Sequence, residues 1–145
     1  MTRRENLAPI ALFVYNRLEY LRQTVEALQK NELAADSDLI VFCDGPKNLA
    51  TANDFKKINA VRDYVKVISG FKSVSVIENV VNKGLSNAIF SGVTEVIHKY
   101  GKVIVLEDDL VTSPYFLRFM NEGLERKKDD GQKTLFTKPS NPNRP

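Results

Sequence analysis

The sequence has a single cysteine, a single histidine and no apolar run long enough to cross a bilayer. With one thiol, no disulfide can form within the chain, so Cys43, which lies in the apolar run 39–43, is expected to be a small buried hydrophobic residue. As the only histidine, His98 is expected to have a packing or surface role. Residues 1–6 are not followed by a signal-like apolar region with a small-residue cleavage site. We therefore expect a cytoplasmic protein without a transmembrane segment, either free or associated with a membrane surface.

The glycine-rich patterns that bind phosphate groups in many nucleotide-binding proteins are also missing. The pattern G-x-x-x-x-G-K-[ST] does not occur, and G-x-G-x-x-G does not follow the first predicted strand. A ligand that contains phosphate would therefore need another source of positive charge, for which a bound metal ion is the simplest.

The chain carries only a weak excess of positive charge. Its formal net charge is +3, much of the basic charge falls near the two ends, and aromatic and basic residues do not interleave on any predicted strand. This pattern favours solvated tails over a nucleic-acid groove, so no nucleic-acid partner is expected. The basic residues near the ends are Arg3, Arg4, Arg126, Lys127, Lys128, Lys133, Lys138 and Arg144.

Apolar runs alternate with segments of helical periodicity along most of the chain. Strands are predicted at residues 9–14, 39–43, 74–78 and 103–106, and helices at residues 18–28, 52–68, 85–97 and 113–127. This alternation implies an α/β fold, with a three-layer αβα arrangement around a mostly parallel, Rossmann-like sheet of about four strands. Residues 1–127 are expected to form one domain. Residues 128–145 lack periodicity and are predicted to be a disordered tail.

The apolar run 103–106 stops at three consecutive carboxylates, Glu107-Asp108-Asp109. Like charges at the rim of a sheet repel one another, so a positive charge is expected nearby, and a divalent cation with oxygen ligands would supply it. The structural alternative is a solvated turn, or acids that favour the next helix N-terminus by about 0.3–1 kcal/mol. On these residues alone both interpretations stay open.

Other predicted loops place polar residues at the same edge of the sheet. The first strand is followed by Tyr15-Asn16-Arg17, where Asn16 with Glu19 resembles a helix capping box and Arg17 has no structural need to be basic. The second strand ends at Asp44, and Asn82-Lys83-Gly84 precedes the third helix. If the strands are parallel, these loops and the acidic turn converge on one crevice. For a nucleoside diphosphate, this crevice offers candidates for a hydrogen-bonding partner of the base, a surface against its ring, and a site for a cation that binds the pyrophosphate.

These segments resemble the GT-A glycosyltransferases, both the broad family 2 and the N-acetylglucosaminyltransferase I type. The resemblance covers residues 9–17, 39–45, 82–88 and 103–114, and the last segment is similar to the N-acetylglucosaminyltransferase I form of the D-x-D motif. It implies a glycosyltransferase of the GT-A fold with a divalent cation, Mn²⁺ or Mg²⁺. The implied donor is a nucleotide-diphosphate sugar, with a UDP-sugar as the expected form, and the implied acceptor is a glycan, a lipid or a protein.

The resemblance also implies roles for individual residues. Asp109 would ligate the metal ion, while Glu107 and Asp108 would hydrogen-bond the ribose and sugar hydroxyls of the donor. Asp44 would contact the base or the ribose. The other residues of the expected nucleotide site are Tyr15, Asn16, Arg17, Lys83 and Gly84.

The chain departs from the family after the acidic turn. Family members continue into an acceptor-binding half, which supplies the catalytic base in inverting enzymes, whereas here one predicted helix and the tail follow, and no base is assigned. We expect the chain to represent the donor-binding half, either of a longer protein or of a short relative. A non-catalytic module that binds nucleotide sugars is the alternative. The helix at residues 113–127 would then leave apolar side chains uncovered, which favours self-association.

Two other α/β classes were weighed against this interpretation. A phosphoacceptor receiver domain should carry an acid pair after its first strand, where this chain has Tyr15-Asn16-Arg17. A sugar nucleotidyltransferase should carry a glycine-rich, arginine-containing loop at the same place, and this loop is missing. Both classes are therefore disfavoured by the segment that follows the first strand.

Overall fold

A computed structural model of the chain describes residues 6–129 and 135–137. Its centre is a sheet in which all paired strands are parallel, in the order β3-β2-β1-β4-β5. The central strand β1 pairs on both sides, so that Leu12 lies opposite Val41 on one neighbour and Leu106 on the other. The strands are β1 (Ile10–Val14), β2 (Asp38–Cys43), β3 (Ser73–Glu78), β4 (Val103–Glu107) and β5 (Leu135–Thr137).

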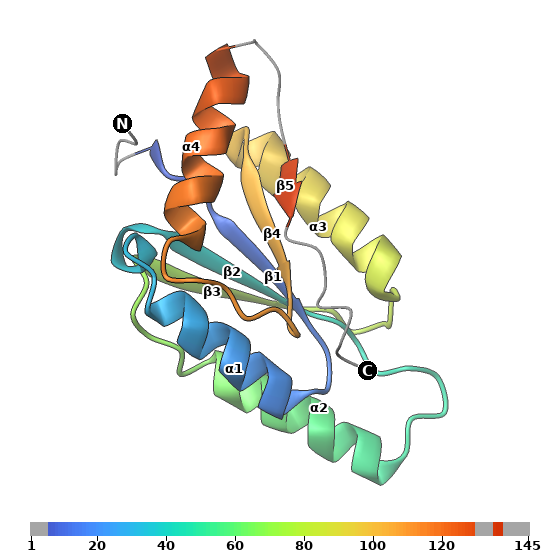
Figure 1. Cartoon of the computed structure of the whole chain (residues 1–145). Helices are drawn as coiled ribbons and strands as arrows, with labels where there is room; N and C mark the ends of the chain where they lie inside the picture. Colours follow the sequence, from blue (N-terminus) through green and yellow to red (C-terminus); the bar gives the residue numbers. More distant parts are fainter. Residues whose placement is uncertain (1–5, 130–134, 138–145) are drawn as a thin grey trace.

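Helices cover both faces of this sheet, which confirms the predicted three-layer α/β fold. Helices α1, α2 and α4 lie on one face and α3 lies on the other (Figure 1). Successive residues of a strand point to opposite faces, and both faces of β1 and β4 are covered, so β1 is apolar throughout and β4 is apolar up to the glutamate that ends it. The helices are α1 (Leu18–Gln29), α2 (Ala52–Val65), α3 (Leu85–Tyr100) and α4 (Phe116–Asp129), with a 3₁₀ turn η2 (Ala34–Asp36).

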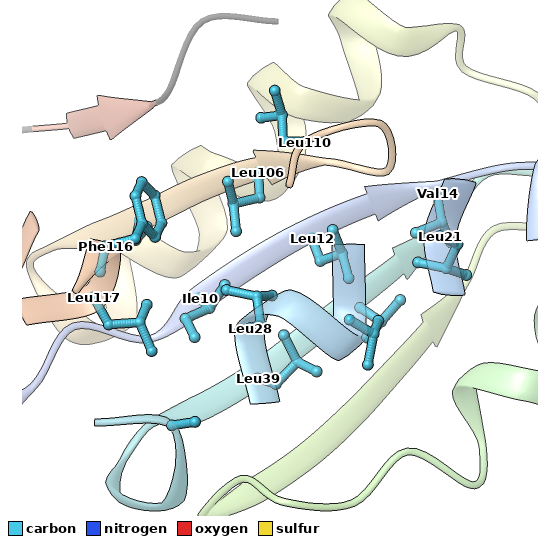
Figure 2. Packing of buried hydrophobic residues seen from close by; sticks show 14 of the residues in the cluster. Ile10, Leu12, Val14, Leu21, Leu28, Leu39, Leu106, Leu110, Phe116 and Leu117 are labelled. Carbon is cyan, nitrogen blue, oxygen red and sulfur yellow. The ribbon is translucent and has the colours of Figure 1, made fainter. Parts of the chain in front are cut away.

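The larger core lies between the sheet and helices α1, α2 and α4. Alternate residues of β1, among them Ile10 and Leu12, meet Leu21 and Leu28 of α1 there (Figure 2). Leu117 of α4 is fully buried in the same cluster. The N-terminal half of α4 is therefore packed onto the sheet through its apolar side. The other buried apolar side chains that α4 contributes to this core are Phe116, Met120 and Leu124.

The smaller core, under α3, depends on a close approach of that helix to the sheet. The rings of Phe13 and Phe42 stack with their centroids 4.8 Å apart, and Gly92 of α3 lies directly over them. A Cβ atom at position 92 would come within 2.8 Å of the Phe13 ring. Gly92 therefore sets the distance between α3 and the sheet.

Two buried asparagines attach α4 to the rest of the domain. Asn31, which follows α1, accepts a 2.9 Å hydrogen bond from the backbone N–H of Leu117 and donates to the Thr112 hydroxyl. Asn121 accepts a 2.8 Å hydrogen bond from the backbone N–H of Ala8, just before β1. Both side chains are almost fully buried, so these bonds satisfy polar groups that would otherwise cost about 1–3 kcal/mol each.

Several local predictions are corrected by the structure. Asn16 does not cap α1: the N-cap residue is Arg17, and no side chain caps this helix, so the predicted capping box is wrong. Phe55 of α2 and Phe119 of α4 are apolar residues of the predicted helices, yet they are 44% and 66% exposed. Cys43 and His98 are buried and exposed, as expected.

The C-terminal region also differs from the sequence-based expectation. Helix α4 reaches Asp129, and β5 adds a fifth strand at Leu135–Thr137, inside the range 128–145 for which a disordered tail was predicted. The expectation does not hold for these described residues, and the other residues of that range lie outside the described part. Within the described ranges, no helix is long and apolar enough to cross a bilayer.

Replacing Gly92 by alanine tests the close contact of α3. We expect Gly92→Ala to lower the free energy of unfolding by about 1–2 kcal/mol, because overpacking of a buried ring outweighs the higher helix propensity of alanine. Urea denaturation followed by circular dichroism measures this change. In a Phe13→Leu background the same substitution should cost less, since the clashing ring atoms are gone. An equal cost in both backgrounds would contradict the assigned contact.

Candidate functional site at the carboxyl edge of the sheet

A cavity of about 270 Å³ opens where β1, β2 and β4 end. Connections lead from β1 through β2 to β3 on one side of the sheet, and the chain then crosses to β4 on the other side of β1. Such a reversal of strand order leaves a crevice at the carboxyl ends of the strands, where open α/β folds bind ligands. The cavity is lined by Phe13, Val14, Tyr15, Asn16, Arg17, Phe42, Asp44, Lys47, Asn82, Gly84, Leu85, Ala88, Glu107 and Asp108.

Asp44 organises one wall of the cavity with its carboxylate. Its Oδ1 atom accepts hydrogen bonds of 2.9 Å from the backbone N–H groups of Gly45 and Lys83, and its Oδ2 atom accepts one of 3.1 Å from Gly84. The residue is 8% exposed. The side chain at the end of β2 therefore fixes the loop that leads into α3.

Two glycines allow the chain to take this shape. Gly45 lies against the backbone of Val80 and Val81, and a Cβ atom there would meet the carbonyl carbon of Val81 at 2.5 Å. Gly84, the N-cap residue of α3, has a φ of 78°, which side chains other than glycine rarely adopt. The Asp44 wall thus requires glycine at both positions, for different reasons.

The opposite wall contains an ion pair between Arg17 and Asp108. The Nη2 atom of Arg17 lies 2.5 Å from Oδ1 of Asp108, whose side chain is 7% exposed. Burial raises the pKa of Asp108 above its usual value, Arg17 opposes this increase, and the charges of Glu107 and Asp109 add to it. The Thr24 hydroxyl also donates a 2.9 Å hydrogen bond to the backbone carbonyl of Asp108. Helix α1 thus anchors the acidic turn.

Tyr15 and Lys47 face each other across the mouth of the cavity. The backbone N–H of Lys47 donates a 3.2 Å hydrogen bond to the Tyr15 hydroxyl, and the Lys47 ammonium lies 5.9 Å from the centroid of the Tyr15 ring. This contact connects the loop after β1 with the loop after β2. Lys47 thus adds a positive charge to the side of the cavity that carries Asp44.

Most of the residues predicted for the site line this cavity. They are Tyr15, Asn16, Arg17, Asp44, Gly84, Glu107 and Asp108. Lys83 contributes its backbone N–H, but its ammonium lies 3.3 Å from the Ser91 hydroxyl on α3. Asp109, the predicted metal ligand, is half-buried in the turn after β4 and does not line the cavity.

The sequence interpretation missed Lys47 and the apolar floor of the cavity. Lys47 directly follows the Gly-Pro turn after β2, and this position is the signal that could have revealed it. The floor comes from Phe13 and Phe42, which were assigned only to strands, and from Ala88 of α3. Their contribution depends on the packing of α3, which no local pattern specifies.

The carboxylate oxygens at this edge suit a metal ion that is coordinated partly by the protein and partly by a bound ligand. Among residues 6–129 and 135–137, no group of three or more acidic, cysteine or histidine side chains is arranged to bind a metal ion by itself. The carboxylates of Glu107 and Asp108 nevertheless line the cavity. Magnesium-type sites commonly use one or two carboxylates together with ligand phosphates. The residues therefore suit a cation shared with a phosphate ligand, not an all-protein cage.

An open parallel sheet with a cavity at its switch point is the architecture in which α/β domains bind ligands at the carboxyl ends of the strands. Residues 10–134 match the family described as Glycosyl transferase family 2. The chain therefore belongs to glycosyl transferase family 2, and its sheet and flanking helices form the GT-A fold of that family. No curated protein and no solved structure matches the chain.

The Arg17–Asp108 pair can be tested through the pH dependence of stability. We expect Arg17→Met to lower the free energy of unfolding at pH 7 by about 1–2 kcal/mol, because the buried carboxylate of Asp108 loses its positive partner. The loss should be no larger, because Arg17 is partly exposed to solvent. The pKa of Asp108 should rise further in this variant. As pH increases, Asp108 then ionises in the unfolded chain at a lower pH than in the folded one. The loss of unfolding free energy relative to the wild type should therefore be small near pH 4 and complete at pH 7.

Thermal or urea unfolding between pH 4 and pH 7, in the presence of a chelator, measures this deficit. Arg22→Met is the matched control, since Arg22 is exposed on the same helix and packs over the Tyr64 ring. A deficit for Arg17→Met that stays constant with pH would show that Asp108 does not depend on Arg17.

Proposed function

We propose that this chain binds a nucleotide-diphosphate sugar in the cavity at the switch point, together with a divalent cation, for transfer of the sugar to an acceptor. Membership of glycosyl transferase family 2 supports glycosyl transfer in general. The observation that carries the proposal is that Asp44, at the end of β2, and Glu107 and Asp108, at the end of β4, line one cavity.

The Asp44 side of the cavity suits the nucleoside. Its carboxylate is oriented by three backbone amides, and a carboxylate has about four acceptor sites, so it retains capacity for the N–H of a base or a ribose hydroxyl. The rings of Phe13 and Phe42 form the apolar floor beside it. Tyr15 supplies an aromatic surface at the mouth. A planar base is the ligand group that such a surface favours.

The acidic side suits the diphosphate and the sugar. A bound Mn²⁺ or Mg²⁺ would neutralise charge on the departing nucleoside diphosphate. We assign Asp109 as the ligand of this cation, although it lies in the turn next to the cavity and does not line it, and Glu107 as the partner of the ribose. Asp108 uses Oδ1 to hold Arg17, which places a guanidinium beside the cavity. Arg17 is thereby positioned to interact with an anionic ligand.

The same geometry gives a second candidate function, a binding module without transfer activity. The carboxylates that line the cavity are Asp44, Glu107 and Asp108, and the proposal assigns all of them to the donor. Inverting transfer also needs a base within hydrogen-bond reach of the acceptor hydroxyl. No residue of the described part is assigned to that role. Measured turnover of a donor separates the two functions.

Binding of UDP should depend on a divalent cation. We expect UDP to bind with Mn²⁺ and to bind at least tenfold more weakly in excess chelator, because the loops provide carboxylates and few fixed phosphate donors. Isothermal titration calorimetry measures both affinities. Asp109→Asn should reduce the manganese-dependent part and leave the melting temperature unchanged, whereas Asp63→Asn, on the exposed side of α2, should change neither.

Equal affinity for UDP with and without chelator would contradict the proposed cation. A large fall in the melting temperature of Asp109→Asn would instead assign Asp109 a structural role in the turn after β4.

Transfer by the chain alone should be weak even where donor binding is strong. We expect a labelled UDP-sugar to bind but to yield little glycosylated product, because the acceptor must be held in line with the anomeric carbon and near a base. Product formation by the purified chain, with candidate glycan and lipid acceptors, measures this. Transfer at ordinary enzyme rates, of about 1 per second or faster, would contradict the expectation.

A further inference from the structure

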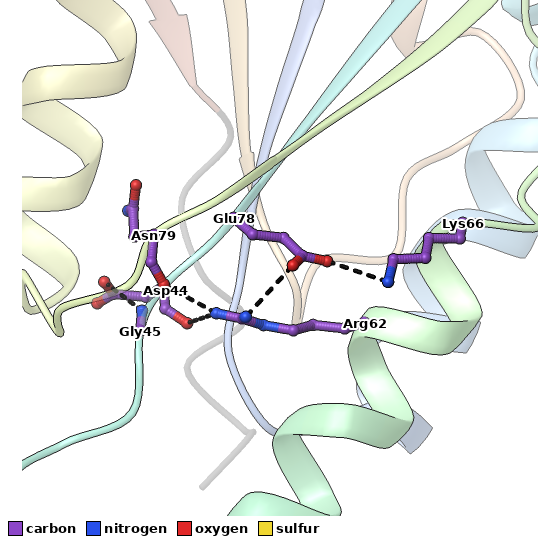
Figure 3. A network of polar contacts seen from close by, with 6 residues as sticks. All are labelled: Asp44, Gly45, Arg62, Lys66, Glu78 and Asn79. Carbon is purple, nitrogen blue, oxygen red and sulfur yellow. Dashed lines mark hydrogen bonds and ion pairs between the residues drawn. The ribbon is translucent and has the colours of Figure 1, made fainter.

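The side chain of Arg62, on helix α2, lies at the ends of strands β2 and β3. Its Nη2 atom donates hydrogen bonds to the backbone carbonyls of Asp44, at 3.1 Å, and Asn79, at 2.9 Å. Its Nη1 atom lies 3.4 Å from the Glu78 carboxylate, which also pairs with Lys66 at 3.4 Å (Figure 3). One guanidinium thus holds the ends of two adjacent strands.

These two carbonyls mark the place where the backbone leaves the sheet. The N–H of Asn79 still donates to the carbonyl of Cys43, at 2.8 Å, and the N–H of Asp44 to the carbonyl of Val14. Beyond these residues the regular pairing of β2 and β3 ends, and the two segments continue into the loops that border the cavity. The Arg62 side chain is 18% exposed, and its fork of donors matches two carbonyls and a carboxylate better than a single ammonium would.

The strand ends held by Arg62 continue directly into the Asp44 wall. The carboxylate of Asp44 accepts hydrogen bonds from the backbone N–H groups of Lys83 and Gly84. The side chain of Asn82 donates a 2.8 Å hydrogen bond to the carbonyl of Gly45. A shift in the Asp44 backbone would therefore move the carboxylate and the loop before α3 together. Arg62 does not line the cavity itself, so any effect on a ligand must pass through these contacts.

We propose that Arg62 is a positioning residue that sets the geometry of the Asp44–Gly84 wall of the cavity. Its importance for nucleotide binding rests on the function proposed above, but the effect on the wall does not. Helix α2 does not depend on Arg62 for its own formation. It is capped by Thr51 and Asp54 in a reciprocal capping box, and it packs through Ile58 and Val61, which are buried.

The experiment compares Arg62→Met, Arg62→Lys and Lys66→Met by NMR spectroscopy of the ligand-free protein. The reporters are the amide signals of Gly45, Lys83 and Gly84, which donate to the Asp44 carboxylate. In Arg62→Met these signals should shift, and their hydrogen exchange should become at least tenfold faster relative to amides of the sheet centre. Lys66→Met, which removes a cation from the same helix and the same partner Glu78, should leave them unchanged.

Binding of UDP with Mg²⁺ provides the second measurement. We expect affinity to fall about tenfold in Arg62→Met and less in Arg62→Lys, since small displacements of a binding group weaken binding strongly. Unchanged amide signals in Arg62→Met would overturn the inference, whatever the affinity. Uniformly faster exchange across the whole sheet would also overturn it, because it would assign Arg62 to global stability. If the wild-type chain does not bind UDP, the proposed function fails, while the amide signals still decide the role of Arg62.

Discussion

The shape of the candidate site depends on one buried carboxylate. Asp44 accepts three backbone amide hydrogen bonds, and by doing so it joins the end of β2 to the loop that begins α3. Hydrogen bonds to a charged acceptor are stronger than neutral ones, and a buried carboxylate without them would be very unfavourable. The wall of the cavity is therefore formed by the protein's own backbone before any ligand arrives, which lowers the conformational cost of binding.

The two sides of the cavity use charge in different ways. On the Asp44 side the negative charge is balanced by backbone dipoles, and Arg62 acts behind it on the strand ends. On the β4 side, Asp108 is balanced by the guanidinium of Arg17, and the carboxylates of Glu107 and Asp109 add negative charge close to Asp108. Under the proposed function, a cation that arrives with a diphosphate would meet these carboxylates, and the base would lie on the Asp44 side of the same cavity.

The architecture follows from the sequence because its signals are redundant. Apolar runs such as residues 10–14 and 103–106 alternate with helical periodicity, and a polar residue stands at or just after the end of each of the three strands that border the cavity, so topology alone brings the loops together. The helix N-termini were harder to predict. Asn16 looked like a cap because capping sequences are short and common, yet here its backbone belongs to the turn before α1 and its side chain lines the cavity.

The contacts that depend on tertiary packing could not be predicted. Helical spacing places Arg62 at the margin of the apolar face of its helix, and only the approach of α2 to the strand ends makes it a partner of Asp44 and Asn79. The floor of Phe13 and Phe42 likewise requires α3 to approach closely over Gly92. Local patterns specify which face of an element is buried, but they do not specify which distant atom a side chain will meet.

The most direct test of this account is a crystal structure of the chain with UDP and Mn²⁺. It should show the base beside Tyr15 and Asp44, the diphosphate between Arg17 and the acidic turn, and an anomalous manganese peak within coordination distance of a carboxylate of residues 107–109. A nucleotide bound outside the cavity, or an empty cavity in crystals grown with saturating UDP and Mn²⁺, would contradict the claim that the carboxyl edge of this sheet is the donor site.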